Sequence, residues 1–176
     1  TGDLEVIGNS TPRYEYGIRL GADYKGFDFS IFMQGVGKRD IWGAGFLAIP
    51  GFNTGDGAMP QAIAGNYWRE DRTDAFYPAA YNLAGSNTGF NMQTQDRYLL
   101  NMSYFRIKNI TFGYNFNKHQ IQHLGVDALK LYVSAENPFT IRADHRMEDF
   151  DPETPSGRGT DTRGTSSISL GVNLTF

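Results

Sequence analysis

The chain has 176 residues, enough for one ordinary domain, and its formal net charge of -3 gives no reason to expect a nucleic-acid partner. The sequence contains no cysteine, which excludes disulfides, thiol nucleophiles and zinc–thiolate sites together. Its 21 glycines, 13 phenylalanines and 10 tyrosines are typical of a β-rich chain with aromatic surfaces. No segment is long and apolar enough to cross a bilayer as a helix, and no signal segment opens the chain, which starts at Thr1 and so suggests a mature or fragmentary product.

The first two predicted strands form a hairpin. From residue 13 to residue 24 the even positions are mostly aromatic or aliphatic and the odd ones are polar or glycine, which predicts a strand with two different faces. Lys25 and Gly26 predict a tight turn before a return strand at 27–37. Phe27, Phe29, Ile31 and Met33 lie opposite the polar positions of that strand, with Phe32 as the exception.

The third predicted strand, 104–117, changes its alternation part of the way along. Phe105 and Ile107 share one parity, whereas Ile110, Phe112, Tyr114 and Phe116 share the other. One extra residue near Lys108 and Asn109 restores the register, so we predict a bulge there.

The last two predicted strands cover 128–139 and 166–176. Leu129, Leu131, Val133 and Ala135 alternate with polar residues, and Pro138 predicts the end of that strand because proline cannot donate to a ladder. The final strand alternates without error up to the terminal Phe176.

The connections alternate between short and long. The long loops cover about 38–98 and 140–165, so an up-and-down antiparallel sheet has both of them at one end and both short turns at the other. Aromatic residues gather at the short-turn end, as a girdle at a membrane boundary requires: Tyr24, Phe27, Phe116 and Phe176.

Two all-β folds explain this alternation. A soluble β-sandwich carbohydrate-binding module packs the apolar faces into a core, whereas a transmembrane barrel exposes them to lipid. The strand lengths, the loop sorting and the aromatic ring favour the barrel. The residues then predicted to lie outside any protein core are Ile18, Leu20, Phe29, Ile31, Phe112, Leu131, Val133, Leu170 and Val172.

Seven stretches, taken in order, resemble the C-terminal part of SusC/RagA-type TonB-dependent outer-membrane transporters of Bacteroidetes. They are "VIGNSTPRYEYG", "GFDFSIFMQGVGKRDIW", "YWREDRTDAFYP", "SYFRIKNITFGYNF", "LKLYVSAENPFTI", "DPETP" and "SLGVNLTF". The resemblance implies that residues 1–176 are a C-terminal segment of an antiparallel barrel of about 22 strands. About five strands cannot close such a barrel and no plug domain is present, so the chain is expected to be one piece of a larger protein.

The resemblance also implies partners and a location. These are the remainder of the same barrel and its plug, a SusD-like surface lipoprotein, TonB through a missing N-terminal part, and outer-membrane lipids. The expected role is nutrient uptake, with a glycan oligosaccharide preferred over a peptide because of the resemblance and the aromatic loop. The C-terminus is expected to be periplasmic, with Phe176 read by the barrel-insertion machinery.

The candidate contact residues form two groups. Aromatic residues of the first long loop are suited to stacking on sugars or packing against the lid protein, although they can equally form the loop's own core: Tyr67, Trp68, Tyr77 and Tyr81. Arg106, Glu136 and Asn137, with Lys108, Lys130 and Arg19, are candidates for a substrate-binding lumen wall; the plainer interpretation is that they are solvated.

Other chemistry has weaker support. His119 and His123 have helical spacing but no third metal ligand, so a capped one-turn helix is the better prediction. The acidic loop from Asp144 to Glu153 lacks the spacing of a known calcium loop. No catalytic constellation is apparent, so we predict no enzyme, metal site or cofactor.

Overall fold

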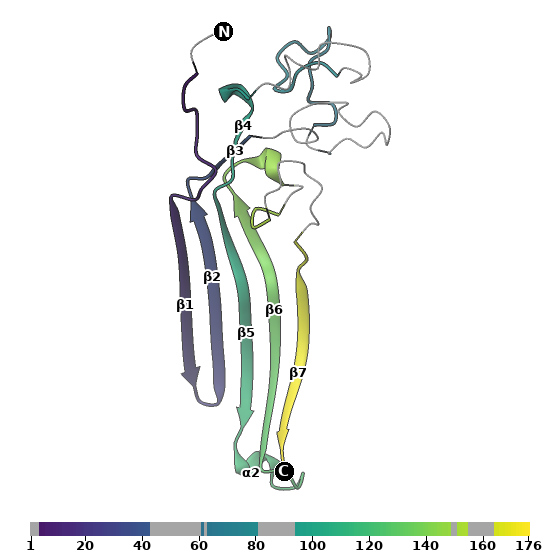
Figure 1. The fold of residues 1–176 in the computed structure, drawn as a ribbon. Coiled ribbons are helices and arrows are strands. Elements are labelled where there is room, and N and C mark those ends of the chain that lie inside the picture. The colour runs from purple at the N-terminus through teal and green to yellow at the C-terminus, as the bar shows by residue number, and fades with distance from the viewer. Residues whose placement is uncertain (1–3, 43–60, 62, 81–93, 149–150, 155–163) are drawn as a thin grey trace. The chain divides into compact units, whose positions relative to one another are not determined.

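The fold is taken from a computed structural model, which describes residues 4–42, 61, 63–80, 94–148, 151–154 and 164–176. Its main element is a sheet of five strands in the order β1-β2-β5-β6-β7. The strands are β1 (Tyr14–Tyr24), β2 (Phe27–Gly37), β5 (Tyr104–Phe116), β6 (Ala128–Arg142) and β7 (Ser167–Thr175). Their arrows alternate in direction in Figure 1.

The chain divides into two compact units. The sheet unit contains residues 15–35, 105–141 and 165–176, and the loop unit contains residues 1–14, 36–104 and 142–164. The loop unit has a small antiparallel sheet of its own, made of β3 (Asp40–Trp42) and β4 (Leu99–Asn101), in which Ile41 pairs with Leu100. Single 3₁₀ turns precede β4 (η2, Asp96–Tyr98) and follow β6 (η3, His145–Met147).

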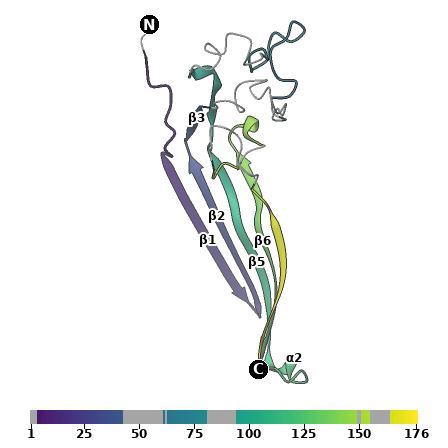
Figure 2. The same cartoon turned by 45° about the vertical axis from the view of Figure 1, so that its right-hand side comes forward.

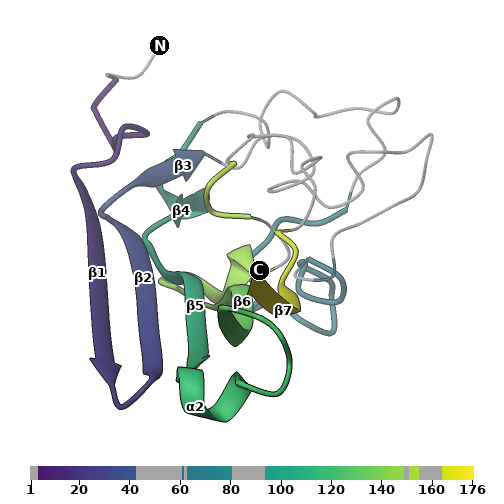
Figure 3. The ribbon, with the colours of Figure 1, turned by 90° about the horizontal axis from the view of Figure 1, so that it is seen from below.

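One face of the large sheet carries exposed apolar side chains, as the alternation predicts. In β7, Leu170 is 86% exposed and Val172 is 58% exposed. Of the nine residues predicted to lie outside a core, Phe29 and Ile31 are half-buried and the other seven are exposed. Figures 2 and 3 show the five strands as a single layer, so these side chains are not packed between two sheets as the sandwich requires.

The opposite face is polar and fixes the register of β5 against β6. Arg106 Nε donates to Thr140 Oγ1 at 2.9 Å, and Asn109 Nδ2 donates to Ser134 Oγ at 3.1 Å. Because both acceptors have even numbers while the two donors differ in parity, β5 changes its alternation between Arg106 and Asn109. This agrees with the bulge predicted near Lys108 and Asn109.

The predicted end of the fourth strand is wrong. β6 runs on to Arg142, with Pro138 inside it rather than at its end. The β6–β7 pairing stops at Glu136 and Ser167, so Pro138 lies beyond this ladder and its missing N–H removes no hydrogen bond to β7. Asn137, with φ at +46°, supplies the local irregularity before the proline.

Short connections and the C-terminus lie at one end of the sheet (Figure 1). Lys25 and Gly26 both have positive φ, which matches a tight hairpin turn. The other connection contains α2 (Lys118–Ile121), capped by reciprocal hydrogen bonds between Asn117 and Gln120, as predicted for a capped single turn.

Aromatic rings also gather at this end. The ring centres of Phe27 and Tyr114 are 4.6 Å apart, those of Phe27 and Phe112 are 5.6 Å apart, and those of Tyr114 and Phe116 are 4.8 Å apart. Such a cluster is typical of the aromatic girdle of a membrane barrel. Among the described residues no helix has the length and apolarity that a membrane span demands.

Candidate substrate-contact site in the long loop

In the loop unit the segment 63–77 folds back on itself, with a parallel bridge between Tyr67 and Tyr77 and an antiparallel bridge between Arg69 and Arg72. Asn66 N donates to Ile63 O at 2.8 Å, Tyr77 N donates to Asn66 O at 3.3 Å, and Trp68 N donates to Tyr77 O at 2.9 Å. These backbone bonds fix Trp68 directly beside Tyr77. The "YWREDRTDAFYP" stretch therefore has a defined local structure.

Two arginine side chains, those of Arg69 and Arg72, make further contacts within this segment. Arg72 donates to the carbonyl of Gly65 and, through Nη2, to Asn66 Oδ1 at 3.2 Å. The guanidinium carbon of Arg69 lies 5.7 Å from the ring centre of Tyr67. Tyr67 thus packs within the loop, which is the plainer of the two roles considered for these aromatics.

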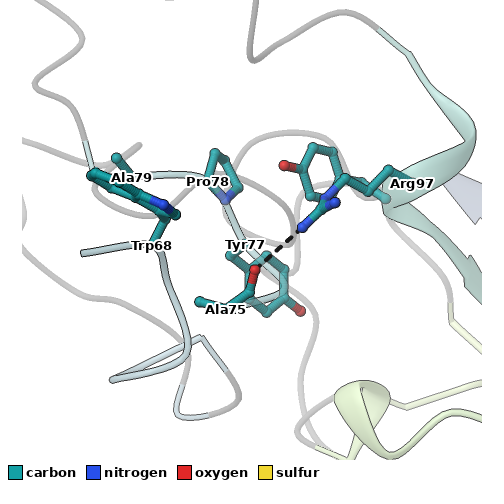
Figure 4. A pocket seen from close by; sticks show the side chains of 7 residues that line it. Trp68, Ala75, Tyr77, Pro78, Ala79 and Arg97 are labelled. Atoms are coloured by element: carbon teal, nitrogen blue, oxygen red, sulfur yellow. Dashed lines mark hydrogen bonds between the residues drawn. The ribbon is translucent and has the colours of Figure 1, made fainter. Parts of the chain in front are cut away.

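A pocket of about 310 Å³ opens beside Trp68. Its lining combines aromatic rings, small apolar side chains and one cation: Trp68, Ala75, Tyr77, Pro78, Ala79, Arg97 and Tyr98. Figure 4 shows Trp68 and Ala79 on one side and Arg97 on the other, with Tyr77 between them. Trp68 is 42% exposed, whereas Tyr77 is 2% exposed and forms part of the base.

Arg97 is held by the same segment. Its Nη2 donates to Ala75 O at 3.2 Å and to Phe76 O at 3.4 Å, and its guanidinium carbon is 5.7 Å from the ring centre of Tyr98. Arg97 belongs to no periodic pattern of the sequence, because its partners are more than twenty residues away along the chain.

An ion pair supports the aromatic cluster behind the pocket. Arg146 donates to buried Asp144 through Nε at 2.7 Å and Nη2 at 2.5 Å, and its guanidinium carbon lies 3.9 Å from the ring centre of Phe76. Phe76 meets Tyr77 and Tyr98 edge to face, with ring centres 4.9 and 5.6 Å away. The segment at 144–146 is thereby fastened to the aromatic side of the loop.

The electrostatics of this cluster follow from burial and from the arginine. Burial raises the pKa of Asp144, but the hydrogen bonds and charge of Arg146 outweigh it and hold the pKa below its ordinary 3.8. The hydrogen bond with Asp144 raises the pKa of Arg146. Burial raises the pKa of Tyr77 to about 12, so this phenol stays protonated near neutral pH.

Of the predicted loop aromatics, the structure brings Trp68 and Tyr77 together at the pocket. Tyr67 forms a backbone bridge with Tyr77 but does not line the pocket, and Tyr81 falls outside the described residues. Their contact with a substrate or a lid protein stays a prediction.

The predicted lumen residues have different surroundings. Arg106 is 2% exposed, Glu136 is exposed and pairs with Ser167 in the ladder, and Asn137 Nδ2 donates to Thr165 O at 3.3 Å. Arg19 lies over the ring of Phe32 at 5.3 Å, which places that exceptional Phe on the polar side of β2. Lys108 lies in β5, and Lys130 pairs with Asp28. A lumen wall formed by these residues stays a prediction.

Two possible metal sites were considered from the sequence, the pair His119 and His123 and the acidic loop from Asp144 to Glu153. Within the part of the chain that the structure describes, no group of three His, Cys, Asp or Glu side chains is placed to hold a metal. In the acidic loop, Asp144 is paired with Arg146 and Asp151 Oδ1 accepts from Glu153 N at 3.0 Å, as in a local turn.

No protein-family model matches the chain. TonB-dependent receptor P3 of Formosa agariphila is 28% identical over 171 residues, which cover 97% of this chain and 16% of the receptor. TonB-dependent receptor P26 of the same organism is 24% identical and is matched over 18% of its length. The chain thus spans less than a fifth of these relatives.

Solved structures share the fold. Structures of the RagAB peptide importer in its open-open and closed-closed states match with a TM-score of 0.66 at 19% identity, covering 97% of this chain and 18% of theirs. A structure of the RagAB peptide transporter gives 0.67. By sequence this chain is similar to part of two TonB-dependent receptors, and by fold it is similar to part of the RagAB structures.

Proposed function

We propose that this chain forms part of the barrel wall of a TonB-dependent outer-membrane nutrient importer, and that it acts without catalysing a reaction. The observation that carries the proposal is the match to two TonB-dependent receptors over at least 97% of the chain. The exposed apolar face of the large sheet supports it, because such a face suits lipid and not water.

In this proposal the five strands of the large sheet cross the membrane and the long connections lie outside the cell. The Lys25–Gly26 turn, α2 and Phe176 then face the periplasm. The alternation of short and long connections supports this orientation, since short periplasmic turns and long extracellular loops are the rule in bacterial barrels. The remaining strands, the plug and the TonB-contacting segment belong to the rest of the receptor.

We infer that the substrate is a glycan oligomer and that a SusD-like lipoprotein closes over the loops. The pocket beside Trp68 supports a sugar ligand, because a flat exposed indole gives a large contact area at a low entropy cost. The RagAB neighbours, named for peptide import, favour an oligopeptide as the second candidate.

Growth and uptake separate these candidates. A strain lacking the complete receptor is grown on defined oligosaccharides or on defined oligopeptides, with the receptor restored from a plasmid as the control. The proposal expects loss of growth and of labelled-oligosaccharide uptake, and it expects a protonophore to abolish the restored uptake. Unchanged uptake of every glycan together with lost peptide uptake makes peptide the substrate, and unchanged uptake of both classes refutes nutrient import of these kinds.

A further inference from the structure

We propose that the pocket beside Trp68 recognises a sugar residue that carries a carboxylate, that is, a uronate within an oligosaccharide. The inference rests on the proposed glycan import and adds the chemical class of the substrate. It depends on how Arg97 and Trp68 are placed across one small pocket (Figure 4).

Arg97 provides a positioned anion receptor. Among the described residues that line the pocket it is the one that carries a charge. Both hydrogen bonds that fix it, to Ala75 O and Phe76 O, come from Nη2. A guanidinium has five N–H donors in a planar fork, so donors on Nε and Nη1 remain for a carboxylate.

Trp68 provides the opposite wall. Its backbone N–H bonds to Tyr77 O at 2.9 Å, which holds the residue while its side chain stays 42% exposed. Pro78 and Ala79 beside it are small and apolar. The C–H face of a pyranose ring can stack on such a surface, and the ring substituent then reaches across to Arg97.

The volume of the pocket limits the size of the ligand. At about 310 Å³ the pocket is at the small end of ligand sites, which favours one ring of a longer chain over several. A neutral sugar ring can stack on the indole of Trp68 but offers no charged partner to Arg97. A uronate uses both, because the fork of an arginine matches a carboxylate better than a single hydroxyl.

The test uses the purified full-length receptor and two matched ligands, tetragalacturonate and its methyl ester, which differ in charge and share the same rings. Calorimetry is expected to show at least tenfold tighter binding of the acid by the wild-type receptor. Arg97→Gln is expected to weaken binding of the acid at least tenfold and to leave the ester unchanged. Trp68→Ala is expected to weaken both ligands, whereas Lys118→Gln, a charge-matched control in α2, leaves both unchanged.

The outcomes separate this inference from the proposed function. Equal affinity for acid and ester in the wild-type receptor overturns the inference, and this comparison needs no variant to fold. Binding and uptake of a neutral oligosaccharide alone also overturns it, while glycan import stands. Binding of a tetrapeptide through its free carboxylate, with no glycan bound, overturns the inference and the glycan import together.

Discussion

Lys130 Nζ lies 2.7 Å from Asp28 Oδ1, although β5 separates the strands to which the two residues belong. The pair crosses β5 at Gly113, where a Cβ would lie 2.6 Å from Asp28 Oδ2 and 2.7 Å from Lys130 Cε. Asn115 Nδ2 also donates to Asp28 Oδ2, at 3.0 Å. Three neighbouring strands are therefore linked on the polar face because Gly113 has no side chain.

Gly113→Ala should displace this ion pair and destabilise the folded barrel by about 1 to 3 kcal/mol, the usual cost of overpacking. The urea midpoint of the full-length receptor, followed by heat-modifiable gel mobility, measures the change. Gly21→Ala is the control, since a Cβ at Gly21 makes only an ordinary contact at 3.6 Å. If the pair is the cause, the effect of Gly113→Ala shrinks when Asp28 and Lys130 are both alanine; an unchanged effect contradicts the explanation.

Leu170→Arg should cost about 2 to 4 kcal/mol if this position is near the bilayer midplane, because the charge is then moved into lipid. Leu170 is 86% exposed on the apolar face, and the neighbouring Ser169 has the opposite parity. Folding into vesicles, measured by urea titration, compares Leu170→Arg with the control Ser169→Arg. Equal costs at the two positions contradict a lipid-facing side.

Asp144→Asn should loosen the segment at 144–146 by leaving the donors of Arg146 without their charged partner, at a cost of about 1 to 3 kcal/mol. Tryptic cleavage after Arg146 in the folded receptor should then become faster. Asp71→Asn is the control, because the pair between Arg69 and Asp71 is largely exposed. Equal cleavage of Asp144→Asn and wild type shows that the ion pair does not hold the segment.

The pKa of Asp144 also predicts a pH dependence. Because the folded state holds this pKa below 3.8, the ion pair contributes its full stability above about pH 4 and loses it as the pH falls through the lower folded value. Hydrogen exchange of residues 142–148, corrected for intrinsic rates, should give the same protection at pH 5 and at pH 8. A loss of protection between these two values contradicts the assignment.

Deleting Phe176 should lower the amount of folded receptor in the outer membrane far more than the loss of one interfacial aromatic. Phe176 is 85% exposed, so packing within the described sheet does not explain such an effect. Tyr24→Ala removes another exposed aromatic, 69% exposed, at the same end of the sheet and serves as the control. Cell fractionation and heat-modifiable mobility report location and folding. Equal amounts of folded protein for the two variants refute a recognition role for Phe176.

The large sheet was predictable because apolar and polar residues alternate along its strands, and this period of two indicates a strand with two different faces. In β7 that period runs unbroken from Ile168 to Leu174. The predicted change of parity in β5 agrees with Arg106 and Asn109, which differ in parity but both bond to even-numbered residues of β6. The strand end predicted from Pro138 was wrong because a proline disrupts a strand only where a neighbouring strand needs its N–H. The β6–β7 ladder has already ended at that position.

The loop unit was predictable only in part. Its aromatics indicated a local cluster, and Trp68 and Tyr77 do meet at the pocket. The contribution of Arg97 depends on bonds to carbonyls 22 and 21 residues away, and the pair of Asp28 with Lys130 joins residues 102 positions apart. No periodic pattern records such contacts, since they arise when loops and strands are brought together by the fold.

The central claim is that the two faces of this sheet meet different solvents, lipid and water. A fluorescent label on a single cysteine measures this directly, since this chain has no cysteine of its own. In full-length receptor with no other cysteine, in vesicles, a label at Leu170→Cys should be quenched by brominated lipid and not by iodide. A label at Ser169→Cys should show the reverse. Quenching of both labels by iodide alone, or of neither by lipid, contradicts a barrel wall.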